Sequence, residues 1–375
     1  MKKLGIYVHV PFCVQKCLYC DFCSFPKYDE DGVRAYVGAL CREIARYGAS
    51  ADGYSVDTVY FGGGTPTLLP ISEFERIFAS IYENFSVENG AEISCECNPA
   101  TADEEYFYAL RELGANRLSI GLQSVNKAEL RALGRIHGYR DFVDTYDSAR
   151  RVGFENISAD LMYGIPEQTL QSFDRSLCSL SSLAPEHISV YGLKIEDGTP
   201  FGKMRERLIL PDEDIEYEMY MLCSERLAEF GYAKYEISNF SRRGYESRHN
   251  VKYWTGEDYL GFGVAAHSFF AGERFANSRD IKGYILGESI ECERRKISRA
   301  DQMTEYVMLR MRLARGVEFS DFKARFGVDF NDVYANAFAK YEMGGYVTRG
   351  AESISFTDRG FLVSNFILSD VLDFE

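Results

Sequence analysis

Residues 13–20 read Cys-Val-Gln-Lys-Cys-Leu-Tyr-Cys, and this short stretch decides how the rest of the chain is interpreted. Its three cysteines are separated first by three residues and then by two. Thiolates at this spacing can hold three corners of a four-iron cluster, because soft sulfur ligands favour iron–sulfur and zinc centres. Structural zinc sites usually pair two Cys-x-x-Cys units far apart in the sequence, and no distant second unit exists here. The spacing therefore favours a [4Fe–4S] cluster with one iron left open by the protein.

The overall composition excludes several classes of protein. The 375 residues include 42 basic and 57 acidic side chains, a net charge of −15, which argues against nonspecific binding to nucleic acid or to anionic membranes. No apolar run is long enough to span a bilayer or to act as a signal peptide, so stable membrane insertion is not expected. Ten cysteines, clustered only near the start, indicate reduced thiols and a metal site in the cytoplasm.

Short apolar segments alternate with amphipathic helical segments over the first 200 residues. Six strands are predicted, at residues 4–10, 57–61, 91–97, 116–121, 156–162 and 187–193. This alternation indicates parallel βαβ units, arranged either as a partial TIM-like barrel or as an open doubly wound sheet. One face of the strands carries polar residues such as His9, Glu96 and Asp160, which favours a barrel whose interior is a binding site. Cys95 and Cys97 lie on the opposite face, where buried structural thiols are favoured over a second metal site.

A different pattern begins near residue 211. A predicted helix leads to residues 241–254, where Arg242, Arg243, Arg248 and Lys252 gather beside His249, Tyr253 and Trp254. Imidazole, flat aromatic rings and cations together suit a planar macrocycle with carboxylate arms. The alternative interpretation is a solvated loop anchored by one aromatic side chain.

The last 75 or so residues predict three helices, at about 301–314, 319–326 and 331–343, and a hairpin around 345–357. This outline is that of a small, mostly helical, winged-helix-like module. Residues 301–375 hold 8 basic and 12 acidic side chains, net −4, so a cover or a partner surface is favoured over DNA binding. The expected division is 1–210 for the barrel, 211–295 for a linking segment and 296–375 for the C-terminal domain.

The cysteine spacing directly after a short strand resembles the signature of the radical S-adenosylmethionine (SAM) superfamily. The resemblance implies a partial (β/α)6 barrel and a cluster on Cys13, Cys17 and Cys20 whose open iron is chelated by SAM. It also implies reductive cleavage of SAM to methionine and a 5′-deoxyadenosyl radical. The positions that resemble the SAM contacts of this family are Tyr7, Gly62, Gly63, Gly64, Thr65, Glu96, Gln123, Arg135 and Asp160. Taken alone, the glycine triplet is also typical of a tight turn. Each of the polar residues, taken alone, is also typical of a surface or helix-capping position.

Over essentially the whole chain, the sequence is similar to the oxygen-independent coproporphyrinogen III oxidase family, and within it to the heme chaperone branch, HemW. The oxidase has Cys-x-Cys at the end of its loop and a long N-terminal extension, whereas this chain has Phe22 there and starts almost at its first strand. Residues 249–254 resemble the His-Asn-x-x-Tyr-Trp heme motif of the chaperone branch, which implies heme contacts from His249, Asn250, Tyr253 and Trp254. Cys23 departs from the usual Asn of that branch, and is expected to be a free thiol rather than a fourth cluster ligand.

The expected function is therefore that of a cytoplasmic radical SAM heme chaperone with a [4Fe–4S] cluster, SAM and heme as cofactors. Its expected partners are an electron donor and heme-accepting proteins, not nucleic acid. The main alternative is an oxygen-independent oxidase that decarboxylates coproporphyrinogen propionates to vinyl groups. A radical SAM enzyme acting on some other substrate is a third possibility.

Overall fold

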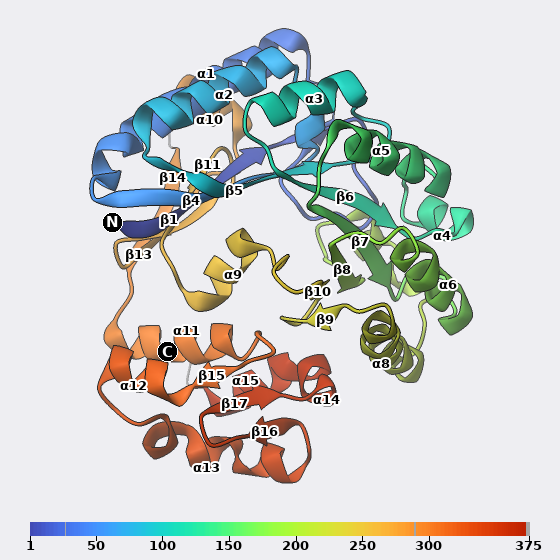
Figure 1. The fold of residues 1–375 in the computed structure, drawn as a ribbon, viewed down its shortest axis with the longest axis vertical. Helices are drawn as coiled ribbons and strands as arrows, with labels where there is room; N and C mark the ends of the chain where they lie inside the picture. The colour runs from blue at the N-terminus through green and yellow to red at the C-terminus, as the bar shows by residue number, and fades with distance from the viewer. Residues whose placement is uncertain (27, 289, 373–375) are drawn as a thin grey trace.

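The computed structural model of the protein describes residues 1–26, 28–288 and 290–372, and within them the chain is organised around one twelve-stranded sheet. Six parallel strands in chain order form its centre, and they curve into a partial barrel (Figure 1). The sheet is open, and the prediction of a partial (β/α)6 barrel is confirmed. These strands are β1 (Lys2–Val10), β4 (Tyr54–Gly63), β5 (Val87–Cys97), β6 (Arg117–Gln123), β7 (Ile157–Tyr163) and β8 (His187–Gly192).

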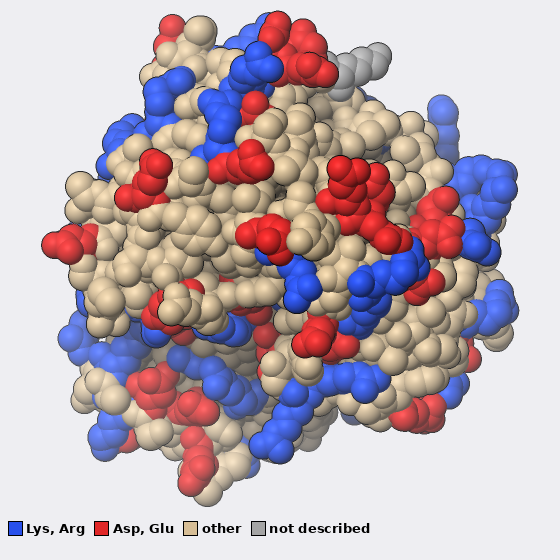
Figure 2. Space-filling model, turned by 45° about the horizontal axis from the view of Figure 1, so that its top comes forward, with Lys and Arg blue, Asp and Glu red and all other residues tan. Residues whose placement is uncertain are grey.

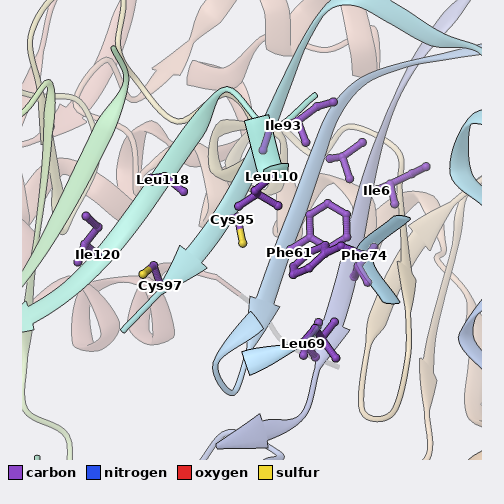
Figure 3. Packing of buried hydrophobic residues seen from close by; sticks show 14 of the residues in the cluster. Ile6, Phe61, Leu69, Phe74, Ile93, Cys95, Cys97, Leu110, Leu118 and Ile120 are labelled. Carbon is purple, nitrogen blue, oxygen red and sulfur yellow. The ribbon is translucent and has the colours of Figure 1, made fainter. Parts of the chain in front are cut away.

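Helices cover the convex side of this sheet (Figure 1). Each one presents an apolar stripe to the outward-facing side chains of the strands, as the ring contact of Phe61 with Phe74 at 5.2 Å illustrates (Figure 3). Each large apolar side chain buried here stabilises the fold by about 1.5–3 kcal/mol relative to its exposed state. The helices are α1 (Glu30–Gly48), α2 (Ile71–Asn84), α3 (Glu104–Glu112), α4 (Lys127–Ala132), α5 (Tyr139–Val152), α6 (Leu170–Ser181) and α8 (Glu213–Glu229).

Cys95 and Cys97 belong to this apolar layer, among side chains such as Ile93 and Leu118 (Figure 3). They are 0% and 3% exposed, and burial raises the pKa of Cys97 to about 11. A thiol held protonated in an apolar layer is a poor metal ligand. The two residues act as structural thiols, as the sequence analysis favoured.

Residues 233–296 add strands to both edges of the barrel sheet. On one side β10 (Asn239–Ser241) pairs with β8 and carries β9 (Ala233–Lys234) at the outside. On the other side β11 (Tyr259–Phe262) runs parallel to β1 and is followed by three antiparallel strands. These are β12 (His267–Phe270), β13 (Glu273–Asn277) and β14 (Glu291–Lys296). The predicted boundaries at 210/211 and 295/296 stay predictions, and the middle segment contributes strands to both edges of the barrel sheet.

Shorter elements join these parts. They are β2 (Phe12–Cys13), β3 (Phe25–Pro26), α7 (Pro200–Lys203), α9 (Arg248–Thr255) and α10 (Ile281–Leu286). Helix α9 lies between the curved sheet and the C-terminal helices (Figure 1). It packs on β4 on one side and on the first C-terminal helix on the other.

The C-terminal module has an apolar core of its own and a three-stranded sheet ordered β15–β17–β16. Its expected three helices and hairpin are present, followed by two short helices that the sequence analysis did not predict. It is held to the barrel by backbone hydrogen bonds from Ile237 to Arg312 and from Ala314 to Tyr235. Its elements are α11 (Arg299–Arg310), β15 (Val317–Glu318), α12 (Phe319–Phe326), α13 (Phe330–Met343), β16 (Val347–Arg349), β17 (Ser353–Phe356), α14 (Asp358–Leu362) and α15 (Ser364–Val371).

The surface agrees with the composition. Figure 2 shows acidic and basic side chains in small, interspersed groups over the visible face. Among residues 1–26, 28–288 and 290–372, every helix is too short or too polar to cross a lipid bilayer.

Glu236 gives the fold a testable pH dependence. Its side chain is 1% exposed at the junction with the C-terminal module, and burial raises its pKa to about 7 despite the nearby charges of Lys234 and Arg312. The unfolded chain releases this proton near pH 4.5 and the folded chain near pH 7, so stability falls as pH rises between these values. Glu236→Gln is therefore expected to raise the free energy of unfolding at pH 8, by up to about 3 kcal/mol.

The difference between Glu236→Gln and the wild type is expected to vanish at pH 4, as measured by urea unfolding at the two pH values. Glu291→Gln is the control of opposite sign, because a hydrogen bond from Arg294 lowers the pKa of that carboxyl. A gain for Glu236→Gln that is equally large at both pH values would contradict the assignment.

Candidate functional site

A cavity of about 520 Å³ opens on the concave side of the sheet. Side chains from β4 to β8, the cysteine loop and α9 line it together. The carboxyl ends of parallel strands meet at one edge of a barrel, which is why residues far apart in sequence converge there. The cavity is thus the place where most of the predicted site residues meet.

The cysteine loop connects β2 to β3 and closes one side of the cavity. Cys13, Cys17 and Cys20 all line the cavity and are partly exposed. Cys23 is instead buried behind the loop, where its Sγ lies 3.9 Å from the carbonyl oxygen of Arg279. The structure therefore places the three predicted ligands together and the fourth thiol apart from them.

The chemistry of the loop fits an iron–sulfur cluster. Burial raises the pKa of the Cys20 thiol, a cost that a bound metal offsets by favouring the thiolate. Over the described residues, no three His, Cys, Asp or Glu side chains are gathered as a single metal ion requires. A four-iron cluster takes its thiolates at separate corners, and the three cysteines of this loop that line the cavity are the residues that would hold it.

The loop is anchored by its neighbours. Leu18 donates its backbone N–H to Leu133 at 3.1 Å, and its own carbonyl accepts from Phe201 at 3.0 Å. On the inner side, His9 contacts the carbonyl oxygen of Cys23 through Nε2 at 2.8 Å. Contacts on both sides fix where the loop presents its sulfur atoms.

The glycine segment at the end of β4 runs directly under the cysteine loop. A Cβ on Gly63, whose φ is +113°, would lie 2.5 Å from the His9 ring, and one on Gly64 would lie 2.5 Å from the Phe12 carbonyl oxygen. Glycine is therefore required for the close approach of the two segments. Thr65 continues the contact, since its backbone N–H bonds Phe12 at 2.7 Å and its hydroxyl lies 3.7 Å from the Cys13 sulfur.

Two carboxylates lie deep in the cavity. Glu96 accepts hydrogen bonds from the Tyr60 hydroxyl at 2.9 Å and from the Gly63 N–H at 3.2 Å. Burial, and to a lesser degree the negative charge of Asp160, raise the pKa of Glu96 to about 7. Burial also raises the pKa of Asp160, which accepts from the Ser119 hydroxyl at 3.3 Å. Both carboxyls have acceptor capacity left for a ligand.

Arg135 and Gln123 line the cavity at the end of β6. The Arg135 guanidinium donates to Asn98 at 2.8 Å and to the carbonyl of Gly121 at 3.3 Å, while its Nε is buried without a partner. Gln123 has a φ of +71°, beside an irregularity in the pairing of β6 with β7. A non-glycine residue in this left-handed region is strained, and such strain is typical of functional sites.

Two of the predicted SAM residues do not line the cavity. Tyr7 lies behind it, with its hydroxyl 3.0 Å from Nδ1 of His9 and its ring stacked on Tyr60 at 6.2 Å. Gly62 lies beneath Glu96, where an added Cβ would come within 3.1 Å of the carboxylate. Both residues therefore shape the first layer of side chains from behind.

Helix α9 divides the motif of residues 249–254 between two environments. Asn250 faces the cavity, whereas Trp254 contributes to a small pocket against α11 on the opposite side. His249 is 1% exposed between them, and burial lowers its pKa to about 3. Its Nδ1 lies 2.9 Å from the Thr58 hydroxyl and its Nε2 lies 2.8 Å from that of Tyr253. Both ring nitrogens are therefore engaged in this conformation.

Charged residues hold α9 in place. Lys252 is 3% exposed and forms ion pairs with Asp57 and Glu257, each at 2.8 Å. At the N-terminus of the helix, the Glu92 carboxylate accepts from the backbone N–H groups of Arg248 and His249 at 3.1 and 3.0 Å. The Arg248 guanidinium donates to the carbonyl of Gly90 at 2.8 Å. Lys252 and Arg248, two of the four cations expected near a macrocycle, are thus already bound to protein groups.

Several lining residues were not assigned to the site from the sequence, among them four polar residues of β6 and β8. His187, Ser189 and Tyr191 follow one another on the inner face of β8, and Arg117 begins β6 on its inner face. The two-residue periodicity of β8 puts its three residues on one face of the strand, opposite the apolar Ile188 and Val190. Arg117 follows the same periodicity as Ser119 and Gly121, which was the signal that could have revealed it.

Comparison with known proteins agrees with this geometry. The family described as the Radical SAM superfamily matches residues 7–177, and the HemN C-terminal domain matches residues 297–363. The chain is 33% identical over 373 residues to the protein named heme chaperone HemW of Bacillus subtilis (strain 168). The matched region covers 98% of each chain. It is 34% identical over 373 residues to the protein of the same name from Escherichia coli (strain K12), again with 98% of each covered.

Among solved structures, the chain is similar to coproporphyrinogen III oxidase (HemN) from Escherichia coli, described as a radical SAM enzyme. The TM-score is 0.85 and the identity is 26%, over 99% of this chain and 90% of that one. Fold and sequence thus agree along nearly the whole length. The chain belongs to the radical SAM superfamily and, within it, to the family of the heme chaperone HemW proteins.

Proposed function

We propose that the protein is a radical SAM heme chaperone, which binds heme and passes it to acceptor proteins. The observation that carries this proposal is the full-length similarity, at 33% and 34% identity, to two proteins named heme chaperone HemW. An electron donor and the heme acceptors are the partners implied. The cytoplasm is the proposed location, in agreement with ten cysteines that are all free thiols.

The cluster would be held by Cys13, Cys17 and Cys20, with SAM at its open iron. When bound, these two groups supply one-electron chemistry to the cavity. Glu96 would accept from the SAM amino group, and Asp160 would accept from the ribose hydroxyls. Arg135, already oriented by Asn98, would pair with the SAM carboxylate.

The remaining predicted positions would support this first layer of contacts. Gly62, Gly63, Gly64 and Thr65 keep β4 close under the loop, and Tyr7 positions His9 behind it. The proposed division of the chain stays 1–210 for the barrel, 211–295 for the segment with the heme motif and 296–375 for the C-terminal domain.

The alternative function is that of an oxygen-independent coproporphyrinogen III oxidase, and the 0.85 TM-score to HemN favours it. The two functions separate in one anaerobic experiment. Protein with a reconstituted cluster is titrated with heme, and a parallel sample is incubated with coproporphyrinogen III, SAM and reductant. Saturable heme binding without loss of CO2 from the porphyrinogen is expected. Formation of vinyl groups without heme binding would support the oxidase instead.

Heme binding is expected to depend on α9. We propose His249 as the iron ligand, with Asn250, Tyr253 and Trp254 around the macrocycle, because neutral imidazole is a common axial ligand. For this, Nε2 of His249 has to exchange the Tyr253 hydroxyl for iron. His249→Ala is expected to lower heme affinity at least about tenfold and to shift the Soret band.

Tyr253→Phe removes the competing hydroxyl but keeps the ring, so it is expected to keep or raise heme affinity. His9→Ala and His267→Ala are the histidine controls, one buried behind the cavity and one exposed on β12. An unchanged Soret band in His249→Ala, together with a changed one in either control, would move the iron to another histidine.

A further inference from the structure

Arg117 is a buried cation that the proposed SAM contacts leave unused. It begins β6, faces the interior of the barrel opposite Ser94 of β5, and is 2% exposed. Its Nε is buried without a hydrogen-bond partner, and its guanidinium forms no ion pair or side-chain hydrogen bond with the described residues. Burying a guanidinium without a protein partner among the described residues is costly, because a lost hydration bond is not replaced by a hydrogen bond within the fold.

The nearby carboxylates do not resolve this cost. The charge of Arg117 lowers the pKa of Glu96 and Asp160, so it acts on them through space. Neither carboxylate comes within ion-pairing distance, and their closest partners are other groups, such as the Tyr60 and Ser119 hydroxyls. The guanidinium donors therefore stay unpaired, and those that face the cavity can bind something that enters it.

Apart from these two carboxylates, the polar groups of the cavity that lie on β8 and α9 near Arg117 are uncharged. His187 is held neutral, because burial and the charge of Arg117 both lower its pKa. Its ring bonds the Ser158 hydroxyl at 2.7 Å and the Tyr235 hydroxyl at 2.8 Å. Ser189 and Asn250 line the same cavity and can donate hydrogen bonds. An unpaired guanidinium beside neutral hydroxyl and amide donors can bind a planar carboxylate through two parallel hydrogen bonds.

The cavity holds two guanidiniums, but SAM has a single carboxylate. Arg135 is oriented by Asn98 and Gly121 at the end of the cavity that carries the cysteine loop. Gly121 lies near the end of β6, whereas Arg117 is the first residue of that strand and so lies towards the other end of the cavity. We propose that Arg117 forms a second carboxylate subsite on the floor of the barrel, which takes a propionate of the bound tetrapyrrole. This inference rests on the proposed function for the identity of the ligand.

The test compares Arg117→Gln with Arg135→Gln, a matched removal of the other cavity guanidinium. Protein with a reconstituted cluster is titrated anaerobically with heme, heme dimethyl ester, metal-free coproporphyrin and SAM. Arg117→Gln is expected to weaken heme and coproporphyrin binding about tenfold to a hundredfold. In titrations at pH 9, where Glu96 stays ionised without the help of Arg117, the variant is expected to leave SAM binding unchanged. Wild-type protein is expected to bind the dimethyl ester as weakly as Arg117→Gln binds heme. Arg135→Gln is expected to weaken SAM.

A thermal melt accompanies these titrations. Since Arg117 forms no ion pair or side-chain hydrogen bond with the described residues, Arg117→Gln is expected to melt no lower than the wild type, whereas a structural cation would lower the melting temperature. Loss of SAM binding in Arg117→Gln, or unchanged binding of both tetrapyrroles, would overturn the subsite. Wild-type binding of coproporphyrin, dependent on Arg117, with no binding of heme would instead overturn the heme chaperone and support the subsite.

Discussion

Serine in place of Cys17 is expected to abolish the iron–sulfur cluster. After anaerobic reconstitution, iron should fall from about four atoms per chain to near zero, with loss of the visible absorption. The reason is chemical, since a serine hydroxyl is a hard, protonated donor where a soft thiolate is needed. Cys17 lies in the middle of the loop and faces the cavity, so no other thiol can replace it without moving the loop. Cys13→Ser and Cys20→Ser are expected to behave in the same way.

Cys23→Ser is the matched control, because this thiol lies on the same loop but behind it, against Arg279. The variant is expected to keep its full iron content. A second control, Cys292→Ser, removes an exposed thiol on β14, far from the loop in sequence. Iron loss in Cys23→Ser as complete as in Cys17→Ser would show that four thiols hold the cluster, and would contradict the three-cysteine assignment.

Lowering the pH from 8 to 6 is expected to weaken SAM binding about tenfold, because one unit below its pKa a carboxyl is about nine-tenths protonated. The group responsible is Glu96, whose pKa burial raises to about 7 in the folded protein. Above pH 7 it is a carboxylate that attracts the SAM amino group, and below pH 7 that attraction is lost. The neighbouring Asp160 opposes its ionisation, while Arg117 favours it.

Glu96→Gln is expected to bind SAM weakly at both pH values, because the amide keeps the shape of the side chain but has no charge. Affinities can be measured by equilibrium dialysis or by the change in the electron paramagnetic resonance of the reduced cluster. Asp160→Asn tests whether the second carboxylate shares the effect. A pH dependence that survives in Glu96→Gln would assign the titration to another group.

The central part of the fold was predictable because each strand repeats one simple rule. Outward residues such as Ile6 and Leu118 are apolar and inward ones such as Asp160 are polar, so alternation alone located six strands. The cavity residues followed, since parallel strands bring their carboxyl ends to one edge. Gly63 is one of these residues at a strand end, since it is the last residue of β4. Its positive φ and its close contact with His9 leave no room for a side chain there.

Other features depend on contacts that no local pattern contains. The outer strands β9 to β14 are two to six residues long, too short for a clear alternation, and pairing with other strands makes them strands. Helix α9 was left open between a loop and a ligand segment, because the local N-cap Ser247 holds its first turn together with Glu92, which lies 156 residues before Arg248 in the chain. The split of its motif, with Asn250 facing the cavity and Trp254 facing α11, also depends on that docking.

An open sheet leaves two free edges, and unpaired strand edges invite other chains to add strands and aggregate. Here β14, at one edge, carries charged side chains at five of its six positions, and most of them are exposed. Two of these charges also form an ion pair along the edge, from Arg294 to Glu291 at 2.7 Å. At the other edge, β9 has only two residues. The sheet can therefore stay open, with its cavity accessible to ligands. One edge strand is too charged, and the other too short, for another chain to add a strand to it.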